Sequence, residues 1–328
     1  MFSINDIQIF VITRNRPEML KQALHSVLNQ YACGSEIYVL DNSTDDTTQK
    51  TMIDYPKIRY IKTDPLLPFA NFLTAQSLMA MPYSMILHDD DLIHPDYISL
   101  ALKILNSVKD ITYIGCKNTT FYDNNIPDEY KNPTRLSEEF FIIDNPDDFT
   151  LGFWSKINSN WSCSIIKSSI YKQADMPADY KLYGKVNDLA MLSQIMSNGK
   201  GNAVITKDKR ALFYRNHVLS DRFNEKTALT RQQLTNYISL FYKRSRSNKY
   251  LRRIYFLYVI DNIKDNFIPK ITDTDINSFL ISLKEKGLLS AAILLYNKRK
   301  ENLLIRLFFL PVQFIYKRNY YKKFLRKL

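Results

Sequence analysis

Three consecutive carboxylates, Asp89, Asp90 and Asp91, are the side chains in this sequence best suited to bind a metal ion. They follow directly after a short apolar run that ends at His88. Neighbouring negative charges repel one another, and a hard divalent cation bound through carboxylate oxygens and phosphates would neutralise the cluster. Acidic residues after a strand can also be solvated helix caps. The triplet alone leaves both interpretations open.

Polar side chains follow two further apolar runs in the same way. Asp41 and Asn42 come after the run from Ile37 to Leu40, and a carboxylate there could accept hydrogen bonds from a base or a ribose. Thr13 to Arg16 come after the run from Ile7 to Ile12 and supply donors suited to a nucleotide. The three positions together predict a site for a nucleotide and a metal ion.

Strands that alternate with helices must position these three groups. Short apolar runs predict strands at residues 7–12, 37–40, 58–61, 84–87 and 111–114. Helices are predicted after Pro17, after residues 43–46, around residues 69–79 and after Pro95. This alternation predicts an α/β fold with a mostly parallel sheet covered by helices on both faces. In such sheets ligands bind beyond the carboxyl ends of the strands, where all three groups lie.

Composition excludes several other classes of protein. The chain has 328 residues, 45% hydrophobic and 24% charged, which is typical of a globular protein. It has 7 glycines, the first at Gly34, so it has no glycine-rich phosphate loop near its N-terminus. The 3 widely spaced cysteines fit neither a disulfide framework nor a zinc site, and we expect each to be a small core residue. Without a signal-peptide pattern or an apolar stretch of spanning length, the sequence predicts a cytoplasmic protein.

Basic residues are concentrated in the last third of the chain. The formal net charge is +12, and residues 230–328 hold 21 of the 45 Lys and Arg but 6 of the 33 Asp and Glu. Aromatic residues lie among these basic ones, which suits an anionic membrane surface. A solvated helical face is the alternative, and without a recognition motif we expect no nucleic-acid partner. We predict a basic α-helical C-terminal region, 226–328, that attaches peripherally to the inner face of the cytoplasmic membrane.

In order and spacing, the strand-end motifs resemble the family 2 inverting glycosyltransferases of the GT-A fold. The resemblance covers roughly residues 4–115 and rests on Val11-Ile12-Thr13-Arg14-Asn15-Arg16-Pro17, on Leu40-Asp41-Asn42-Ser43-Thr44-Asp45-Asp46-Thr47, and on Ile86-Leu87-His88-Asp89-Asp90-Asp91 with Pro95. It implies a nucleotide-sugar donor, a Mn²⁺ or Mg²⁺ ion and a carboxylate base. It also implies a catalytic domain of residues 1–225, with a nucleotide-sugar half at 1–115 and an acceptor half at 116–225.

The family's pattern assigns the donor contacts residue by residue. The nucleotide pocket would be lined by Thr13, Asn15, Arg16, Asp41 and Asn42, with Asp41 on the base. Arg14 replaces a frequent aromatic residue of the family, so stacking on the base would become a cation–π or phosphate contact.

The acidic triplet departs from the family's DxD motif. Asp90 falls on the metal-binding acid, with Asp89 beside it near the ribose and phosphate. His88 stands where many members have the first Asp, so one metal or ribose contact is either lost or supplied by Asp89. A literal D-x-D pattern would instead select Asp89 and Asp91. All three carboxylates therefore remain candidate metal ligands.

The acceptor half has weaker signals. Residues 117–160 are rich in Asn, Asp and Pro, and we expect a long loop-bearing insertion there, followed by a strand within 158–170. In the resembled family this region lies over the acceptor. Trp161 is therefore a candidate for stacking on an acceptor sugar, as is Trp154, although either tryptophan could be a core residue.

One carboxylate must act as general base, because a hydroxyl is a poor nucleophile until its proton is taken. The segment from Leu182 to Leu192 resembles the family's acidic motif before a helix, which makes Asp188 the candidate base. Asp188 could instead only cap that helix, and Asp179 and Asp175 are the further candidates for the base.

A later segment, Phe213 to Arg222, is the one place where His, Ser and two Arg cluster. Family members often carry Tyr-Arg-x-His here, and the segment closes over the diphosphate. The resemblance implies that the departing nucleoside diphosphate is neutralised by Arg215, His217 and Arg222.

The sequence therefore predicts a metal-dependent, inverting glycosyltransferase that moves a sugar to a hydroxyl of a glycan or lipid-diphosphate-linked acceptor. Bacterial surface polysaccharide, such as lipopolysaccharide or capsule, is the expected product. One alternative is a sugar nucleotidyltransferase, which would need a glycine-rich loop before Gly34. The other is a non-catalytic basic protein that binds membrane or nucleic acid. The sequence predicts neither the donor sugar nor the oligomeric state.

Overall fold

The computed structural model describes residues 1–32, 34–66, 69–146, 149, 160–174, 187–217 and 325–327, with the backbone alone for 187–190 and 325–327. These residues belong to one compact unit, formed by residues 1–226 and 324–328. Over these ranges no helix is both long and apolar enough to cross a membrane. The expected boundary between residues 1–225 and 226–328 stays a prediction.

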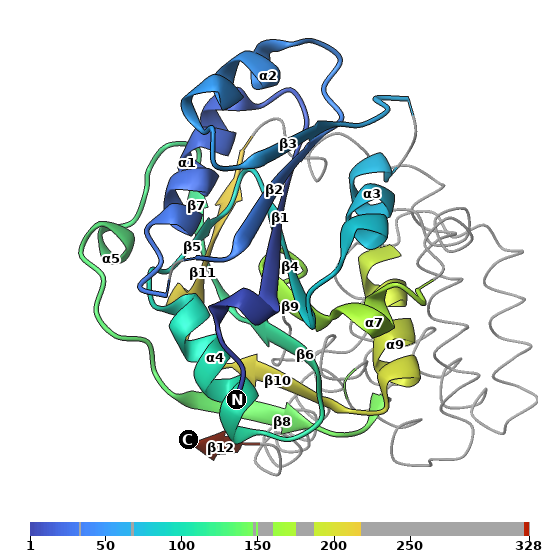
Figure 1. Cartoon of the computed structure of the whole chain (residues 1–328). Helices are drawn as coiled ribbons and strands as arrows, with labels where there is room; N and C mark the ends of the chain where they lie inside the picture. The colour runs from blue at the N-terminus through green and yellow to red at the C-terminus, as the bar shows by residue number, and fades with distance from the viewer. Residues whose placement is uncertain are drawn as a thin grey trace, which may run out of the picture. The chain divides into compact units, whose positions relative to one another are not determined.

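A nine-stranded sheet forms the centre of this unit, in the order β12-β8-β10-β6-β9-β4-β1-β2-β3 (Figure 1). Its strands are β1 (Ile7–Thr13), β2 (Glu36–Asp41), β3 (Arg59–Lys62), β4 (Tyr83–His88), β6 (Ile111–Cys116), β8 (Glu139–Ile143), β9 (Ser164–Lys167), β10 (Asn202–Thr206) and β12 (Leu325–Lys327). By their pairing, β8 and β9 run opposite to all the other strands of this sheet. The mostly parallel sheet predicted from the sequence is confirmed, including its first five strands.

Helices cover both faces of this sheet (Figure 1). On one face lie α1 (Pro17–Leu28) and α4 (Tyr97–Ser107), and on the other lie α3 (Ala70–Leu78), α7 (Ser168–Tyr171) and α9 (Asn187–Gly199). The short helix α2 (Thr47–Thr51) follows β2. In α1, proline at the first helical turn costs no hydrogen bond, and the apolar stripe Leu20, Ala23, Leu24 and Val27 is buried.

A second, three-stranded sheet has the order β5-β11-β7. It consists of β5 (Leu92–Ile93), β7 (Asn118–Tyr122) and β11 (Leu212–Asn216). The prediction of a loop-bearing insertion over residues 117–160 is wrong where β7, the short helix α5 (Asp128–Lys131) and β8 lie. In β7 only Phe121 is buried, so this polar strand has the composition of a loop.

Two other expectations concern the cysteines and the C-terminal region. Cys116 and Cys163 are free and fully buried, as expected of core residues, whereas Cys33 lies outside the described residues. The C-terminal region is predicted to be helical, but Leu325–Lys327 form β12, antiparallel to β8. Residues 218–324, which include the rest of that region, lie outside the described part of the chain.

Candidate active site at the carboxyl edge of the sheet

The three strand-end groups lie side by side at one edge of the large sheet, which we call the carboxyl edge. In the parallel register Thr13 of β1 is opposite Asp41 of β2, and Ile12 is opposite His88 of β4. The antiparallel strand β9 begins at the same edge, since Ser164 is opposite Ile86. The expected convergence of the strand ends is therefore confirmed.

Asp41 is fully buried and its carboxylate is held from several directions. Its Oδ1 accepts the Ser43 backbone N–H at 2.7 Å, and its Oδ2 accepts the Tyr60 hydroxyl at 2.8 Å and Lys62 Nζ at 3.3 Å. Burial and the hydrogen bond to Asp41 raise the pKa of Tyr60 above its usual range. Sequence reasoning missed Tyr60 and Lys62, although Lys62 ends β3 and the strand-end rule could have found it.

Three asparagines connect the loops that follow β1 and β2. Asn15 has a left-handed backbone with φ of 54°, which Asn tolerates better than most residues, and its N–H donates to Ser43 Oγ at 2.6 Å. The Asn42 side chain accepts a hydrogen bond from Asn71 Nδ2 at 3.1 Å, and Asn71 Nδ2 also donates to the Thr13 carbonyl at 3.1 Å. The two loops are thus held as one surface beside Asp41.

The side chain of Asp89 turns toward β1. Its Oδ2 accepts the Thr13 hydroxyl at 2.6 Å and Arg16 Nε at 3.2 Å, while Arg16 NH2 lies 2.5 Å from its Oδ1. Burial raises the pKa of Asp89 to about 7, against the opposing charge of Arg16. Arg16 also reaches Asp90, whose Oδ2 accepts NH1 at 2.8 Å. Arg16 therefore joins the first two carboxylates of the triplet.

His217, which directly follows β11, contacts Asp90, the second carboxylate of the triplet. Its Nε2 lies 3.0 Å from Asp90 Oδ2 and 3.3 Å from Arg16 NH1. Burial alone would raise the pKa of Asp90, but the charges of Arg16 and His88 and the hydrogen bond from His217 hold it below its usual range. The pairing of β11 with β5, which follows the triplet, explains how residues so distant in sequence meet.

Arg215 is 1% exposed and points into the protein. Its backbone N–H donates to Asp91 Oδ1 at 2.9 Å, and its Nε donates to the Asp90 carbonyl at 2.9 Å. The guanidinium also bonds the Asp123 carbonyl, the Asn124 side chain and the Gln22 side chain. In this arrangement Arg215 fixes the acidic loop, and its donors are taken up by the protein itself.

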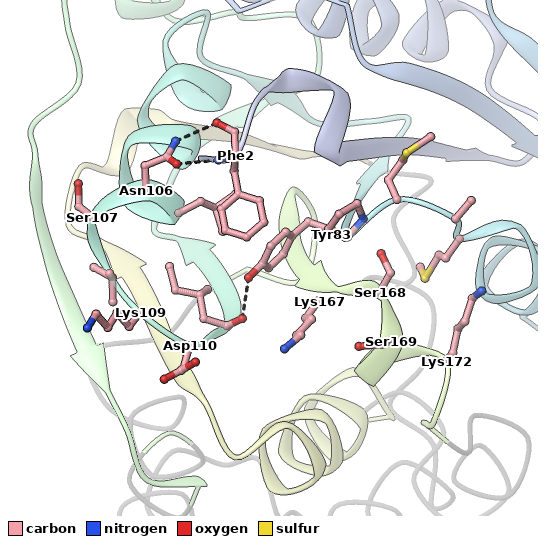
Figure 2. A pocket seen from close by; sticks show the side chains of 17 residues that line it. Phe2, Tyr83, Asn106, Ser107, Lys109, Asp110, Lys167, Ser168, Ser169 and Lys172 are labelled. Atoms are coloured by element: carbon pink, nitrogen blue, oxygen red, sulfur yellow. Dashed lines mark hydrogen bonds between the residues drawn. The ribbon is translucent and has the colours of Figure 1, made fainter.

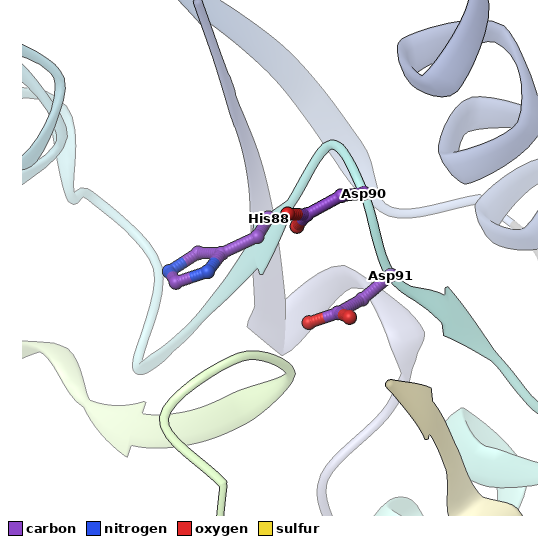
Figure 3. Close-up of side chains that lie close together, drawn as sticks. All are labelled: His88, Asp90 and Asp91. Atoms are coloured by element: carbon purple, nitrogen blue, oxygen red, sulfur yellow. The ribbon is translucent and has the colours of Figure 1, made fainter. Parts of the chain in front are cut away.

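His88, Asp90 and Asp91 form a cluster that could hold a metal ion (Figure 3). One candidate ligand atom from each lies within 4.8 Å of the other two, and Asp89 is not a member of this cluster. Burial raises the pKa of Asp91 well above its usual range. Its Oδ2 is buried and has no partner at hydrogen-bond geometry in the described residues, the nearby Ser162 hydroxyl included. A buried carboxylate oxygen without a donor favours a cation, so these residues fit a divalent metal ion.

Trp161 is buried near the carboxyl edge. It is 5% exposed and packs against the rings of Phe72 and Tyr171, each with a centroid distance of 6.1 Å. The neighbouring Ser162 hydroxyl accepts the His88 backbone N–H at 3.1 Å. A tryptophan packed in this way offers an acceptor sugar little free ring surface.

The remaining predicted residues are described in part or not at all. Asp188 is the second residue of α9, and nothing is described of its side chain. The predicted helix is confirmed, with Leu192, Ile195 and Met196 fully buried. Outside the described residues lie Trp154, Asp175, Asp179 and Arg222.

A cavity of about 780 Å³ lies at the opposite edge of the sheet, which we call the amino edge (Figure 2). Tyr83 and Ile111, the first residues of β4 and β6, line it, and Phe2 packs edge-to-face on Tyr83 with a centroid distance of 5.4 Å. Three exposed lysines, which make no ion pair within the described ranges, also line it: Lys109, Lys167 and Lys172. With Asp110 as its single acidic side chain, this cavity lacks the carboxylate cluster of the carboxyl edge.

Comparisons with known proteins agree with this arrangement. The sequence model described as glycosyl transferase family 2 matches residues 8–173. The structure is similar to residues 1–349 of TarS from S. aureus in complex with UDP-GlcNAc, with a TM-score of 0.60 and 13% identity over 85% of this chain and 80% of that one. It is also similar to the mannosyltransferase PcManGT from Pyrobaculum calidifontis in complex with GDP-Man and Mn²⁺, with a TM-score of 0.53 and 14% identity over 96% and 85% of the two chains. No curated protein sequence matches the chain.

Proposed function

Because this chain belongs to glycosyl transferase family 2 and is a glycosyltransferase of the GT-A type, we propose that it transfers a sugar from a nucleotide-sugar donor, with inversion, to a hydroxyl of a glycan or lipid-linked acceptor. The observation that best supports this is the meeting of three strand ends at the carboxyl edge, which brings Thr13, Asp41 and His88 into neighbouring positions. The donors bound by the two structural neighbours, UDP-GlcNAc and GDP-Man, favour a nucleotide sugar here as well.

The proposed donor lies across the ends of β1 and β2. Asp41 and Asn42 contact the base and ribose, and the braced loop at Asn15 forms the wall beside them. The diphosphate lies toward Arg16 and His217, because these are the basic side chains beside Asp90. In this proposal Asp89 orients Arg16 and Thr13.

We propose that the reaction depends on a Mn²⁺ or Mg²⁺ ion held at the cluster that contains Asp90 and Asp91. Such an ion, when bound, neutralises the charge that develops on the leaving diphosphate. Arg16 and His217 keep Asp90 ionised and in place, while Arg215 holds Asp91 through its backbone N–H. Arg215 is thus proposed as a positioning residue, and Arg222 stays a candidate for the diphosphate.

Asp188 is proposed as the general base. It accepts the proton of the acceptor hydroxyl as that oxygen bonds to the anomeric carbon and the bond to the diphosphate oxygen breaks. The position of Asp188 in the first turn of α9 is compatible with this role and equally with helix capping.

The proposed setting is bacterial surface polysaccharide synthesis, such as lipopolysaccharide or capsule. The excess of basic residues in 230–328 supports peripheral attachment to an anionic membrane, where a lipid-diphosphate-linked acceptor is found. Sedimentation of the purified chain with anionic liposomes at low salt tests this attachment. Absence of binding under those conditions would contradict it.

The test of the transferase proposal is a panel of UDP-, GDP- and dTDP-sugars with Mn²⁺, followed by thermal unfolding and by slow donor hydrolysis. We expect one nucleotide class to stabilise the protein and to be hydrolysed, and Asp90→Ala to lose both effects. Asp128→Ala is the matched control, because the Asp128 side chain is 89% exposed in the short helix α5 and is not part of the acidic triplet. Equal stabilisation of the wild type and Asp90→Ala would contradict the assigned site.

A further inference from the structure

The cavity at the amino edge has a mostly apolar lining (Figure 2). Its volume of about 780 Å³ is typical of a site that holds a small organic ligand. The Tyr83 hydroxyl, at the start of β4, donates to the Ile111 carbonyl, at the start of β6, at 3.0 Å, which fixes the Tyr83 ring. Further apolar side chains extend this surface: Phe2, Met79, Met81, Leu105 and Val108.

Phe2 is held in place at this cavity by its own backbone. Its N–H donates to Asn106 Oδ1 at 2.7 Å, and its carbonyl accepts Asn106 Nδ2 at 2.9 Å. The Phe2 side chain packs edge-to-face on Tyr83, yet Phe2 is still 36% exposed. A partly exposed aromatic ring held in this way offers an apolar ligand a contact surface that needs little ordering on binding.

Positive charge is brought to the same cavity from three separate elements. Lys109 precedes β6, Lys167 ends β9, and Lys172 directly follows α7. Lys167 is opposite Tyr83 in the antiparallel register of β4 and β9, so these two side chains lie on one face of the sheet. The three lysines make no ion pair within the described ranges, and Asp110 is the single acidic side chain of the lining. The cavity therefore combines an excess of positive charge with apolar surface.

We propose that this cavity binds an anionic amphiphile, a molecule in which a phosphate group is joined to an apolar chain. The phosphate pairs with the ammonium groups, which are strong donors to phosphate oxygens, and the chain lies against Phe2 and Tyr83. Inorganic phosphate would leave the apolar lining in water, and a neutral hydrocarbon would leave the lysines unpaired. This inference goes beyond the proposed sugar transfer and does not depend on it.

Calorimetry of the full-length chain with alkyl phosphates, kept below the concentration at which they form micelles, tests both parts of the ligand. Each fully buried methylene strengthens binding about fourfold, so we expect decyl phosphate to bind at least about a hundredfold more tightly than butyl phosphate. Inorganic phosphate should bind more weakly still. Decyltrimethylammonium, which has the same chain and a positive head group, should not bind at the cavity.

A triple variant in which Lys109, Lys167 and Lys172 are replaced by alanine locates the bound phosphate. We expect its affinity for decyl phosphate to fall by more than about tenfold. Thermal unfolding shows whether the variant is folded. The matched control has the same net charge and replaces three exposed lysines that do not line the cavity: Lys50, Lys57 and Lys209. Its affinity should stay within twofold of the wild type.

A phosphate on a free amphiphile and one on a membrane lipid have the same chemistry, and flotation with vesicles distinguishes the two sources. Weaker flotation of the cavity variant than of the control, with phosphatidylcholine vesicles that contain phosphatidic acid, would identify a membrane lipid. Equal flotation of the two, with decyl phosphate binding lost only in the cavity variant, would identify a free amphiphile. Affinity independent of chain length, equal binding of decyltrimethylammonium, or equal losses of decyl phosphate affinity in the two triple variants would each overturn the proposal.

Discussion

The two edges of the large sheet carry charge in opposite ways. At the carboxyl edge three carboxylates are fully buried: Asp41, Asp89 and Asp91. Each accepts at least one hydrogen bond from a defined neighbour. At the amino edge three lysines lie exposed around an apolar cavity, without ion pairs in the described ranges: Lys109, Lys167 and Lys172.

This difference shows where the functional arrangement lowers the stability of the fold. A buried charge is costly unless it is paired and hydrogen-bonded, whereas an exposed lysine remains hydrated. Three buried carboxylates at one edge therefore need a network such as that of Arg16, Arg215 and Lys62. We expect substitutions in this network to affect both stability and turnover, and substitutions at the amino edge to affect neither.

The largest effect is expected for Asp90→Ala. This change removes the carboxylate that meets Arg16 at 2.8 Å and His217 at 3.0 Å, together with a proposed ligand of the ion. We expect kcat/KM for the donor identified in the panel to fall about a thousandfold, the scale on which transition-state charge stabilisation acts. Asp128→Ala should stay within twofold, and more than a tenth of wild-type activity in Asp90→Ala would refute the assignment.

The next effect is expected for Arg215→Lys. Lysine lacks the planar fork that bonds Asp90, Asp123 and Gln22 together, and its shorter reach leaves buried acceptors unpaired. Losing hydrogen bonds between a buried charged donor and neutral acceptors costs about 1.5–3 kcal/mol, which should lower Tm by about 5 °C. We expect Mn²⁺ affinity to change less than Tm, because Asp91 is bonded by the backbone N–H of residue 215, which lysine retains.

Arg210→Lys is the matched control for that variant. Arg210 is part-exposed and pairs with Asp208 at 2.6 Å, away from the acidic triplet. Its Tm should fall by much less, and its affinity for Mn²⁺ should not change. If Arg215→Lys unfolds at the wild-type temperature, the buried network does not hold the loop.

The parallel strands could be predicted because their signal is local. Runs such as Ile7–Ile12 and Ser84–Leu87 are buried on both faces, so they are mostly apolar and are readily recognised. Once these strands alternate with helices, the convergence of Thr13, Asp41 and His88 follows from topology alone.

The small sheet could not be predicted in the same way. β5 has two residues and pairs with β11, which lies more than a hundred residues later. Nothing in a run as short as Leu92–Ile93 specifies so distant a partner. The contact between His217 and Asp90 depends on this pairing, so local sequence patterns cannot reveal it.

The direction of each side chain in the triplet also could not be predicted from the sequence. Asp89, Asp90 and Asp91 are chemically equivalent in the chain, and the motif left open which of them could face an ion. Their neighbours distinguish them, since Asp89 pairs with Arg16 and accepts the Thr13 hydroxyl, whereas Asp91 pairs with no basic side chain in the described residues and accepts the Arg215 backbone N–H. Such choices depend on three-dimensional packing, which a strand-end motif does not encode.

A smaller effect is expected for Asp41→Asn. The amide is nearly the same size but removes the charge that faces Lys62 at 3.3 Å and replaces one acceptor oxygen by a donor. If Asp41 contacts the base, the dissociation constant of the nucleoside diphosphate should rise about tenfold, since one hydrogen bond to a charged group is lost. Calorimetry measures this, and kcat should change far less than affinity.

Tyr60→Phe distinguishes a direct contact between Asp41 and the base from the support that the Tyr60 hydroxyl gives to Asp41. It removes the hydroxyl that donates to Asp41 at 2.8 Å but leaves the carboxylate itself. Binding should weaken by less than in Asp41→Asn. Equal losses in the two variants would mean that the hydrogen-bonded network at the end of β2, rather than a contact from Asp41, determines nucleotide affinity.

The smallest effect is expected at the amino edge, where Lys109, Lys167 and Lys172 are replaced by alanine together. These side chains are exposed and unpaired in the described residues, so their loss should change stability by no more than about 1 kcal/mol in total. Donor turnover should stay within twofold, because the cavity opens at the opposite ends of β4 and β6 from the acidic cluster. Thermal unfolding and donor hydrolysis measure both quantities. A fall in turnover beyond fivefold at unchanged Tm would mean that the amino edge takes part in catalysis, and the contrast between the two edges would no longer hold.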